Sequence, residues 1–203
     1  MTAWLAPVTL GGRYVALEPI GLAHRPEFQA IVGDSRVFAH LTVDLGAPGE
    51  LERWLEQALD AMARGEALVF AKRRVADGRL VGSSRYLNVA AAHRRLEIGW
   101  TWLVPAVWGG PINAESKLLM LSHAFDTLKA NRVEFRTDAR NARSRAAIAA
   151  LGAVQDGVFR RHMVVRDGHV RDTVQFAIID EDWPAVRARL EARLAAKAAR
   201  APA

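Results

Sequence analysis

The stretch Arg95–Phe125, RLEIGWTWLVPAVWGGPINAESKLLMLSHAF, joins a strand pattern, a glycine-containing turn and a helix pattern. Apolar side chains recur at every second position of the first part, which predicts a strand with one apolar face: Leu96, Ile98, Trp100 and Trp102. Glu97 and Gly99 fall on its other face. From Ala114 onward, leucines and Phe125 recur at helical spacing. This unit therefore predicts strand, turn and helix in direct succession.

The turn holds more turn-forming residues than a simple connector needs, namely Gly109, Gly110 and Pro111. The first N–H groups of a helix lack internal partners, and the helix dipole makes that end partly positive. A glycine turn before a helix therefore suits an anion such as a phosphate. Neither a Walker pattern nor GxGxxG is present. The sequence thus gives little support to a nucleotide-hydrolysing or dinucleotide-binding protein.

Further elements lie on both sides of this unit. Asp77-Gly78 and Asp167-Gly168 each separate two alternating runs, which predicts two hairpins. Additional strands are expected over residues 13–20 and 131–139. Helices are expected over 24–32, after a turn within 44–67, over 141–152 and in the C-terminal region. The order predicts an α+β fold with a mixed, mostly antiparallel β-sheet flanked by helices. No linker divides the chain, so we expect one domain over residues 1–203, with a C-terminal helix and Ala/Arg tail over 185–203.

Composition narrows the class of protein. The 203 residues include no cysteine, which excludes disulfides and thiolate chemistry and makes a cytoplasmic location the expectation. No apolar run is long enough to cross a membrane, and no histidine pair has metal-ligand spacing, so neither a membrane association nor a metal is expected. The net charge of +6 fits either a nucleic-acid surface or one pocket for a small polyanion. The sequence has no nucleic-acid-binding motif, so nucleic acid is not the expected partner.

The run TDARNARSRAAIAALGA, residues 137–153, carries the most specific motif of the chain. Together with RLEIGWTWL, PINAESKLLMLSHAFDTL and the final hairpin and helix, it resembles the GNAT superfamily of N-acetyltransferases, nearest the RimJ/RimL type that acetylates ribosomal proteins. The resemblance implies a splayed sheet that holds acetyl-CoA between its two central strands, here those around Glu97 and Phe135. It also implies transfer of the acetyl group to a primary amine, either a protein N-terminus or a small amine. A homodimer is implied as well.

The resemblance assigns roles to individual residues. Glu97 and Ser144 fall on the positions of the general base and the general acid, and Asn141 on the asparagine that binds the pantetheine arm. The hydroxyl of Tyr86 is a second candidate for the general acid. The diphosphate is expected on the loop before the helix. The full set implied to bind acetyl-CoA is Trp102, Leu103, Gly109, Gly110, Ile112, Asn113, Ala114, Asn141 and Arg143.

Three positions leave alternatives open. Trp108 and Pro111 stand where the family loop usually has Gln or Arg and Gly, and proline has no N–H to offer a phosphate. Glu97 is either the base or a strand carboxylate paired with Arg95 or Arg136. Asn141 is fully explained as a helix cap. The altered loop also allows a CoA-binding protein without catalysis, and the basic charge allows a nucleic-acid-binding protein.

Overall fold

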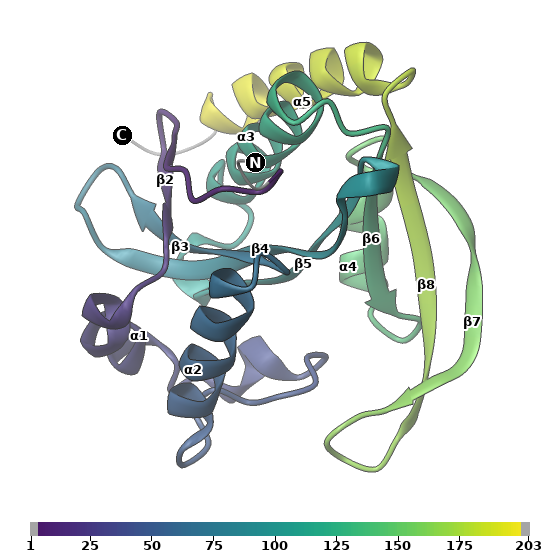
Figure 1. Ribbon diagram of the computed structural model, residues 1–203. Helices are drawn as coiled ribbons and strands as arrows, with labels where there is room; N and C mark the ends of the chain where they lie inside the picture. Colours follow the sequence, from purple (N-terminus) through teal and green to yellow (C-terminus); the bar gives the residue numbers. More distant parts are fainter. Residues whose placement is uncertain (1–3, 200–203) are drawn as a thin grey trace.

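Eight strands form one mixed sheet in the computed structural model, which describes residues 4–199 (Figure 1). The strand order is β1-β2-β3-β4-β5-β6-β8-β7, and every neighbouring pair is antiparallel except β5–β6. The strands are β1 Leu10–Gly11, β2 Val15–Pro19, β3 Leu68–Arg74, β4 Leu80–Ala90, β5 Arg95–Leu103, β6 Arg132–Asp138, β7 Val154–Val164 and β8 Val170–Ile179. The predicted mixed, mostly antiparallel sheet is confirmed.

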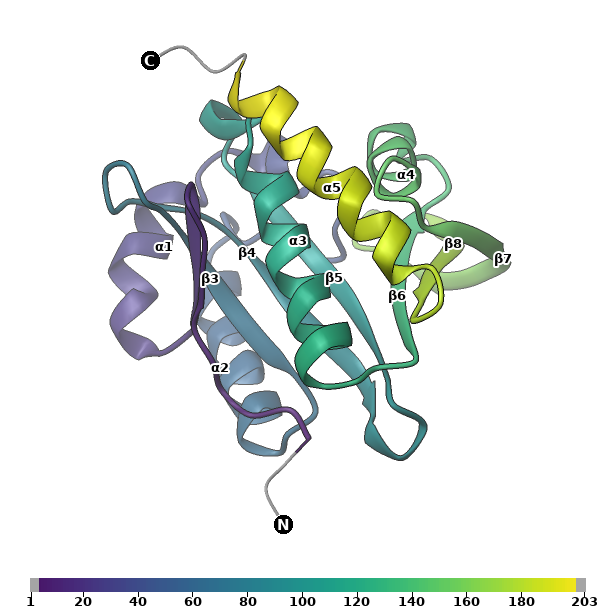
Figure 2. The same ribbon diagram turned by 90° about the horizontal axis from the view of Figure 1, so that it is seen from above.

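Helices cover both faces of the sheet. They are α1 Arg25–Ile31, α2 Glu50–Ala63, α3 Ile112–Ser122, α4 Ala142–Ala149 and α5 Trp183–Ala198. Figure 2 shows α3 and α5 side by side on one face and α1 and α2 on the other. Each face has its own apolar core: Phe70, Met120 and Phe135 belong to the core under α3, and Phe28 and Trp54 to the core under α2. None of the helices within residues 4–199 combines the length and apolarity that crossing a bilayer requires.

A β-bulge in β5 changes which way its side chains point. Trp100 has a φ of 49°, and the register against β4 shifts by one residue between Ser83 and Arg85. Leu96 and Ile98 therefore belong to the core under α3, whereas Trp102 belongs to the core under α2. The prediction that all four apolar residues of this strand share one face is wrong, because an extra residue in a strand reverses the alternation after it.

The two central strands separate after a short paired segment. β5 and β6 pair in parallel only at Arg95–Arg132, Leu96–Val133 and Glu97–Glu134, although both strands continue beyond Glu97 and Glu134. Figure 1 shows β5 and β6 running in different directions past this point. The splayed sheet expected from the resemblance is therefore present, and Glu97 lies at the last residue pair before the strands separate.

Two helices begin earlier than predicted. In α3 the N–H of Glu115 donates to the carbonyl of Pro111 at 2.9 Å, which starts the helix at Ile112 rather than at Ala114. α5 begins at Trp183 rather than at residue 185, because Pro184 is tolerated in a first helical turn, where its missing N–H costs no bond. The last part of the predicted Ala/Arg tail, residues 200–203, lies outside the described residues.

Candidate active site

A cavity of about 590 Å³ lies where β5 and β6 separate. Its walls come from these two strands, the start of α3, α4, the loop after α1 and the far end of α5, together with residues of β4, β7 and β8. Both predicted catalytic residues, Glu97 and Ser144, line it. So do most residues predicted to bind acetyl-CoA: Trp102, Leu103, Gly109, Gly110, Asn113, Ala114, Asn141 and Arg143. The fold thus brings together residues that are up to 47 positions apart in the sequence, from Glu97 to Ser144.

Two of the predicted binding residues direct their side chains into the apolar core. Ile112 is 3% exposed and is not among the residues that line the cavity. Only its main chain is placed to face a ligand at the helix start. Trp102 lines the cavity, but its ring packs 5.4 Å from the ring of Phe38 and 5.9 Å from that of Phe28. The bulge at Trp100 explains this placement of Trp102, because it turns the ring toward the core under α2.

The conformation of the loop before α3 explains part of its composition of two glycines and a proline. Gly109 has a φ of +77°, a conformation that favours glycine, whereas Gly110 has no positive φ. Pro111 stands at the N-cap position, so its missing N–H removes none of the first-turn amides. The N–H groups of Ile112, Asn113 and Ala114 precede the first helical hydrogen bond. The departure at Pro111 therefore leaves an anion-binding helix start intact.

Trp108, the other departure from the family loop, connects three segments. Its indole N–H donates to the carbonyl of Leu103 at 2.7 Å, and the guanidinium of Arg143 lies 4.2 Å from its ring centroid. An arginine over an aromatic face is attracted by the ring quadrupole. Trp108 thus holds the loop against the end of β5 and fixes Arg143 of α4 beside the cavity.

Asn141 and Ser144 open helix α4 at the cavity wall. The Asn141 side-chain oxygen accepts a hydrogen bond from the main-chain N–H of Ser144 at 2.9 Å, which caps the helix. The cap uses the main chain of Ser144, so the structure gives the Ser144 hydroxyl no part in it. The capping explanation therefore accounts for Asn141 but not for the Ser144 side chain.

Glu97 is a buried carboxylate, with its side chain 7% exposed. Asn88 donates to its Oε2 at 2.8 Å, and the Nε of Arg136 lies 3.4 Å from the same oxygen. Burial raises the pKa of Glu97, and the hydrogen bond from Asn88 and the charge of Arg136 oppose that rise. Arg95 pairs instead with Glu134, at 3.6 Å. The predicted pairing with Arg136 is present, yet the raised pKa is also what a general base near neutral pH requires.

Lys117 is a site residue that sequence reasoning missed. It is buried, it lines the cavity one helical turn after Asn113, and its Nζ donates to the Thr101 hydroxyl at 2.8 Å. Burial lowers the pKa of Lys117 to about 7. Lys72, also buried, has no hydrogen-bond partner for its Nζ among the described residues. The signal that could have found these two lysines is their place among apolar residues of a strand and a helix. Lysine is rarely fully buried, so a lysine at such a position indicates a special role.

Arginine and lysine side chains from α5 also reach the cavity. Arg193 and Lys197 line it, and Lys197 donates to the carbonyl of Gly109. No sequence pattern reveals this, because it depends on α5 packing along α3.

Tyr86, the second candidate for the general acid, is buried and its hydroxyl donates to the Met120 carbonyl at 2.6 Å, so this side chain belongs to the core. The described residues contain no group of three or more His, Asp or Glu side chains arranged to hold a metal ion.

Comparisons with known proteins identify the family of the chain. A family model described as an acetyltransferase (GNAT) domain matches residues 15–154. A Bacillus subtilis (strain 168) protein named "Putative ribosomal N-acetyltransferase YdaF" is 25% identical over 177 residues, covering 73% of this chain and 96% of that protein. The family match includes the central strands β5 and β6, the loop before α3, and helices α3 and α4.

Solved structures extend the match over nearly the whole chain. A GCN5-related N-acetyltransferase from Brucella melitensis superimposes with a TM-score of 0.86 at 31% identity, covering 94% of this chain and 86% of that one. Mycobacterium smegmatis RimJ in complex with CoA-disulfide gives a TM-score of 0.79 at 26% identity, covering 92% and 95%. The chain therefore belongs to the GNAT acetyltransferase family, is of the RimJ/RimL type, and is an N-acetyltransferase that uses acetyl-CoA as its acetyl donor.

Proposed function

We propose that this enzyme moves the acetyl group from acetyl-CoA to a primary amine in one direct step, with Glu97 as general base and Ser144 as general acid. The observation that carries the proposal is the placement of a buried Glu97 of raised pKa at the strand separation, in the same cavity as Ser144. An ammonium has no lone pair to donate, so a base must take a proton from the acceptor.

The chain's own residues suit each requirement of this step. Glu97 takes a proton from the amine, whose nitrogen then bonds to the acetyl carbon as the carbon–sulfur bond breaks. Ser144 returns a proton to the departing thiolate. The first-turn amides of α3, with Arg143, Arg193 and Lys197 beside them, offer positive charge for the CoA phosphates. Asn141 is proposed to bind the pantetheine arm, through the part of its amide that the cap does not use.

The acceptor belongs to the proposal as well. The names of the Bacillus subtilis relative and of RimJ support the N-terminal amine of a protein, with a ribosomal protein as the first to test. A small amine is the other acceptor to test. By resemblance alone we also propose one domain over residues 1–203, a homodimer and a cytoplasmic location.

A pH–rate profile of Glu97→Gln tests the assignment. The wild-type rate should fall as the pH drops through the pKa of Glu97, above the usual range for glutamate, because the base is then protonated. Glu97→Gln should lower turnover by roughly 10²–10⁴-fold at neutral pH. Its loss should shrink at high pH, where the amine is already deprotonated. Acetyl-CoA affinity, measured by calorimetry, should barely change.

Glu134→Gln is the matched control. Glu134 is the β6 partner of Glu97 in the register, and its buried carboxylate pairs with Arg95, Arg132 and Arg136. It is not among the residues that line the cavity. This variant should keep the acidic limb of the profile, moved to lower pH because the charge of Glu134 helps to raise the pKa of Glu97. Full activity of Glu97→Gln at neutral pH would reduce Glu97 to a structural partner of Arg136 and overturn the assignment.

A further inference from the structure

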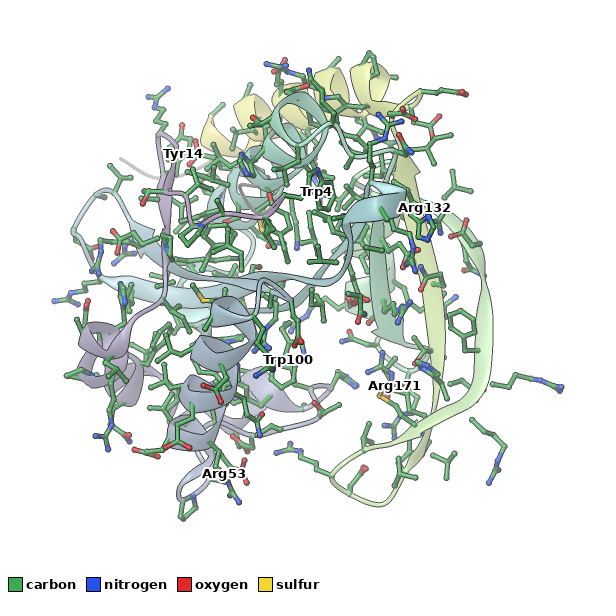
Figure 3. The ribbon with its side chains drawn as sticks, viewed as in Figure 1. Trp4, Tyr14, Arg53, Trp100, Arg132 and Arg171 are labelled. Atoms are coloured by element: carbon green, nitrogen blue, oxygen red, sulfur yellow. The ribbon has the colours of Figure 1, made fainter. Side chains whose placement is uncertain are left out.

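Arg171 is a buried arginine for which the proposed reaction has no use. It lies on β8, is 9% exposed and lines the cavity. Its Nε has no hydrogen-bond partner within residues 4–199, and no carboxylate there lies within ion-pair distance of it. In Figure 3, Arg171 lies on the β8 side and Trp100 on the β5 side of the same region. A buried, unpaired guanidinium is costly, so an arrangement that keeps one needs an explanation.

The two carboxylates whose charges act on Arg171, Asp138 and Glu97, are already engaged by other groups. Asp138 accepts hydrogen bonds from the main chain of Arg140 at 2.8 Å and from its guanidinium at 3.0 Å. Glu97 is held by Asn88 and Arg136. Burial lowers the pKa of Arg171, and Asp138 and Glu97 only partly oppose that shift through their charges. The protein therefore supplies negative charge near Arg171, but no carboxylate of residues 4–199 forms an ion pair with its planar guanidinium group.

The surroundings of Arg171 separate it from the CoA phosphates. Helix α3 and its loop, which suit the diphosphate, belong to one part of the cavity wall, whereas Arg171 lies on β8 opposite Met163 of β7. Glu97 lines the same cavity as Arg171, and its charge acts on the pKa of Arg171. A group bound by Arg171 would thus lie on the acceptor side, near the carboxylate proposed to deprotonate the amine.

We infer that Arg171 binds a carboxylate of the acceptor, so that the preferred substrates are amines that carry a carboxylate close to the reacting nitrogen. This rests on the proposed function and specifies its substrate class. An arginine binds a carboxylate through two parallel hydrogen bonds, which fixes orientation as well as adding affinity. The carboxylate has two sources, the α-carboxylate of a free amino acid or an acidic side chain next to a peptide N-terminus.

Matched acceptors test the inference directly. One pair is a free amino acid and its amide, and the other is a C-terminally amidated peptide beginning Ser-Asp and the same peptide beginning Ser-Asn. Wild-type kcat/KM should favour the carboxylate member of at least one pair by roughly 10- to 100-fold, as expected for hydrogen bonds to a charged group. A preference in the first pair alone identifies the α-carboxylate, and one in the second alone identifies the side chain.

Variants then show whether Arg171 is responsible. Arg171→Gln should bring the ratio close to one while the carboxamide acceptors keep their turnover, which also shows that the variant is folded. Arg171→Lys, which keeps the charge but loses the fork, should give an intermediate ratio. Arg160→Gln on the exposed part of β7 should leave the ratio unchanged. A wild-type ratio of one, or a preference that survives in Arg171→Gln, would overturn the inference alone. No acetylation of any of the four acceptors would overturn the inference, and the proposed function would fail with it only if no amine of a wider set of N-terminal peptides and small amines is acetylated.

Discussion

The hydroxyl of Ser144 takes no part in the cap of α4, so its role can be tested without disturbing the helix. The main-chain N–H of Ser144 donates to the capping Asn141 side-chain oxygen, so removing the hydroxyl leaves the start of α4 as it is. Ser144 lines the cavity that Glu97 also lines. Any effect of a Ser144 substitution on turnover is therefore an effect of the hydroxyl itself.

We predict that Ser144→Ala lowers kcat by roughly 10²-fold or more, because the departing thiolate loses its proton donor. Unlike the loss in Glu97→Gln, this one should not shrink at high pH, since deprotonating the amine does not help the leaving group. Thermal unfolding should be close to that of the wild type. The check is a pH–rate profile with one accepted amine, and undiminished kcat across the range would remove Ser144 from the mechanism.

Burial lowers the pKa of Lys117, which lines the cavity. Its pKa of about 7 in the folded protein lies well below that of an exposed lysine. Between these two values the unfolded chain binds more protons than the folded one, so stability should rise with pH. Below pH 7 both states are protonated and the cost of burying the charge is fully present. The neighbouring Lys72, whose pKa burial and Lys117 also lower, should add in the same direction.

Lys117→Met should therefore be more stable than the wild type at low pH, and the difference should shrink as the pH rises from about 7 toward 10. Urea unfolding at a series of pH values measures this. Lys129→Met, at an exposed position, is the control and should show no such trend. Parallel stability curves for Lys117→Met and wild type would mean that Lys117 titrates normally.

At the level of elements, the pairing of β4 with β5 depends on close backbone contact. Gly82 of β4 has a φ of +152°, and a Cβ there would lie 2.1 Å from the Trp102 carbonyl oxygen. Main-chain atoms cannot move aside as the end of a flexible side chain can. This close approach sits beside the bulge that turns Trp102 into the α2-side core, so both features shape the cavity wall together.

Gly82→Ala should accordingly lower the free energy of unfolding by about 2 kcal/mol or more, through strain and local separation of the two strands. Gly157→Ala in β7 is the control, because a Cβ there meets nothing within 4 Å and its φ is not in the left-handed range. Its stability should be nearly unchanged. Denaturant unfolding of both variants decides the matter, and a wild-type midpoint for Gly82→Ala would contradict the strand contact.

The elements also show how far the sequence predicts the fold. Asp77-Gly78 and Asp167-Gly168 specify their hairpins through local chemistry, and both hairpins are present with positive φ at the glycines. The bulge at Trp100 could not be predicted, because a tryptophan with positive φ has no local preference for that conformation. Nor could the burial of Lys117 and Arg171, which depends on packing between distant segments. Local patterns thus predict most elements and the positions of Glu97 and Ser144, but not the lining that tertiary packing adds.

For the molecule as a whole, part of the net charge of +6 comes from basic residues that line the cavity. Arg143, Arg193 and Lys197 come from two helices to line one part of a single cavity, while Arg171 lines another. A concave site with an excess of positive charge attracts an anionic ligand by raising its local concentration. This arrangement fits a protein that binds acetyl-CoA at one end of its cavity and an acceptor at the other.

The central claim is that this cavity supports transfer, and not only binding, of the acetyl group. The most direct test incubates the purified protein with acetyl-CoA and a set of N-terminal peptides and small amines, and follows product mass and free CoA thiol together. We predict at least one acceptor that gains an acetyl group, with CoA released in equal amount and both lost in Glu97→Gln at neutral pH. Binding of acetyl-CoA with no acetylated product from any amine would contradict the account.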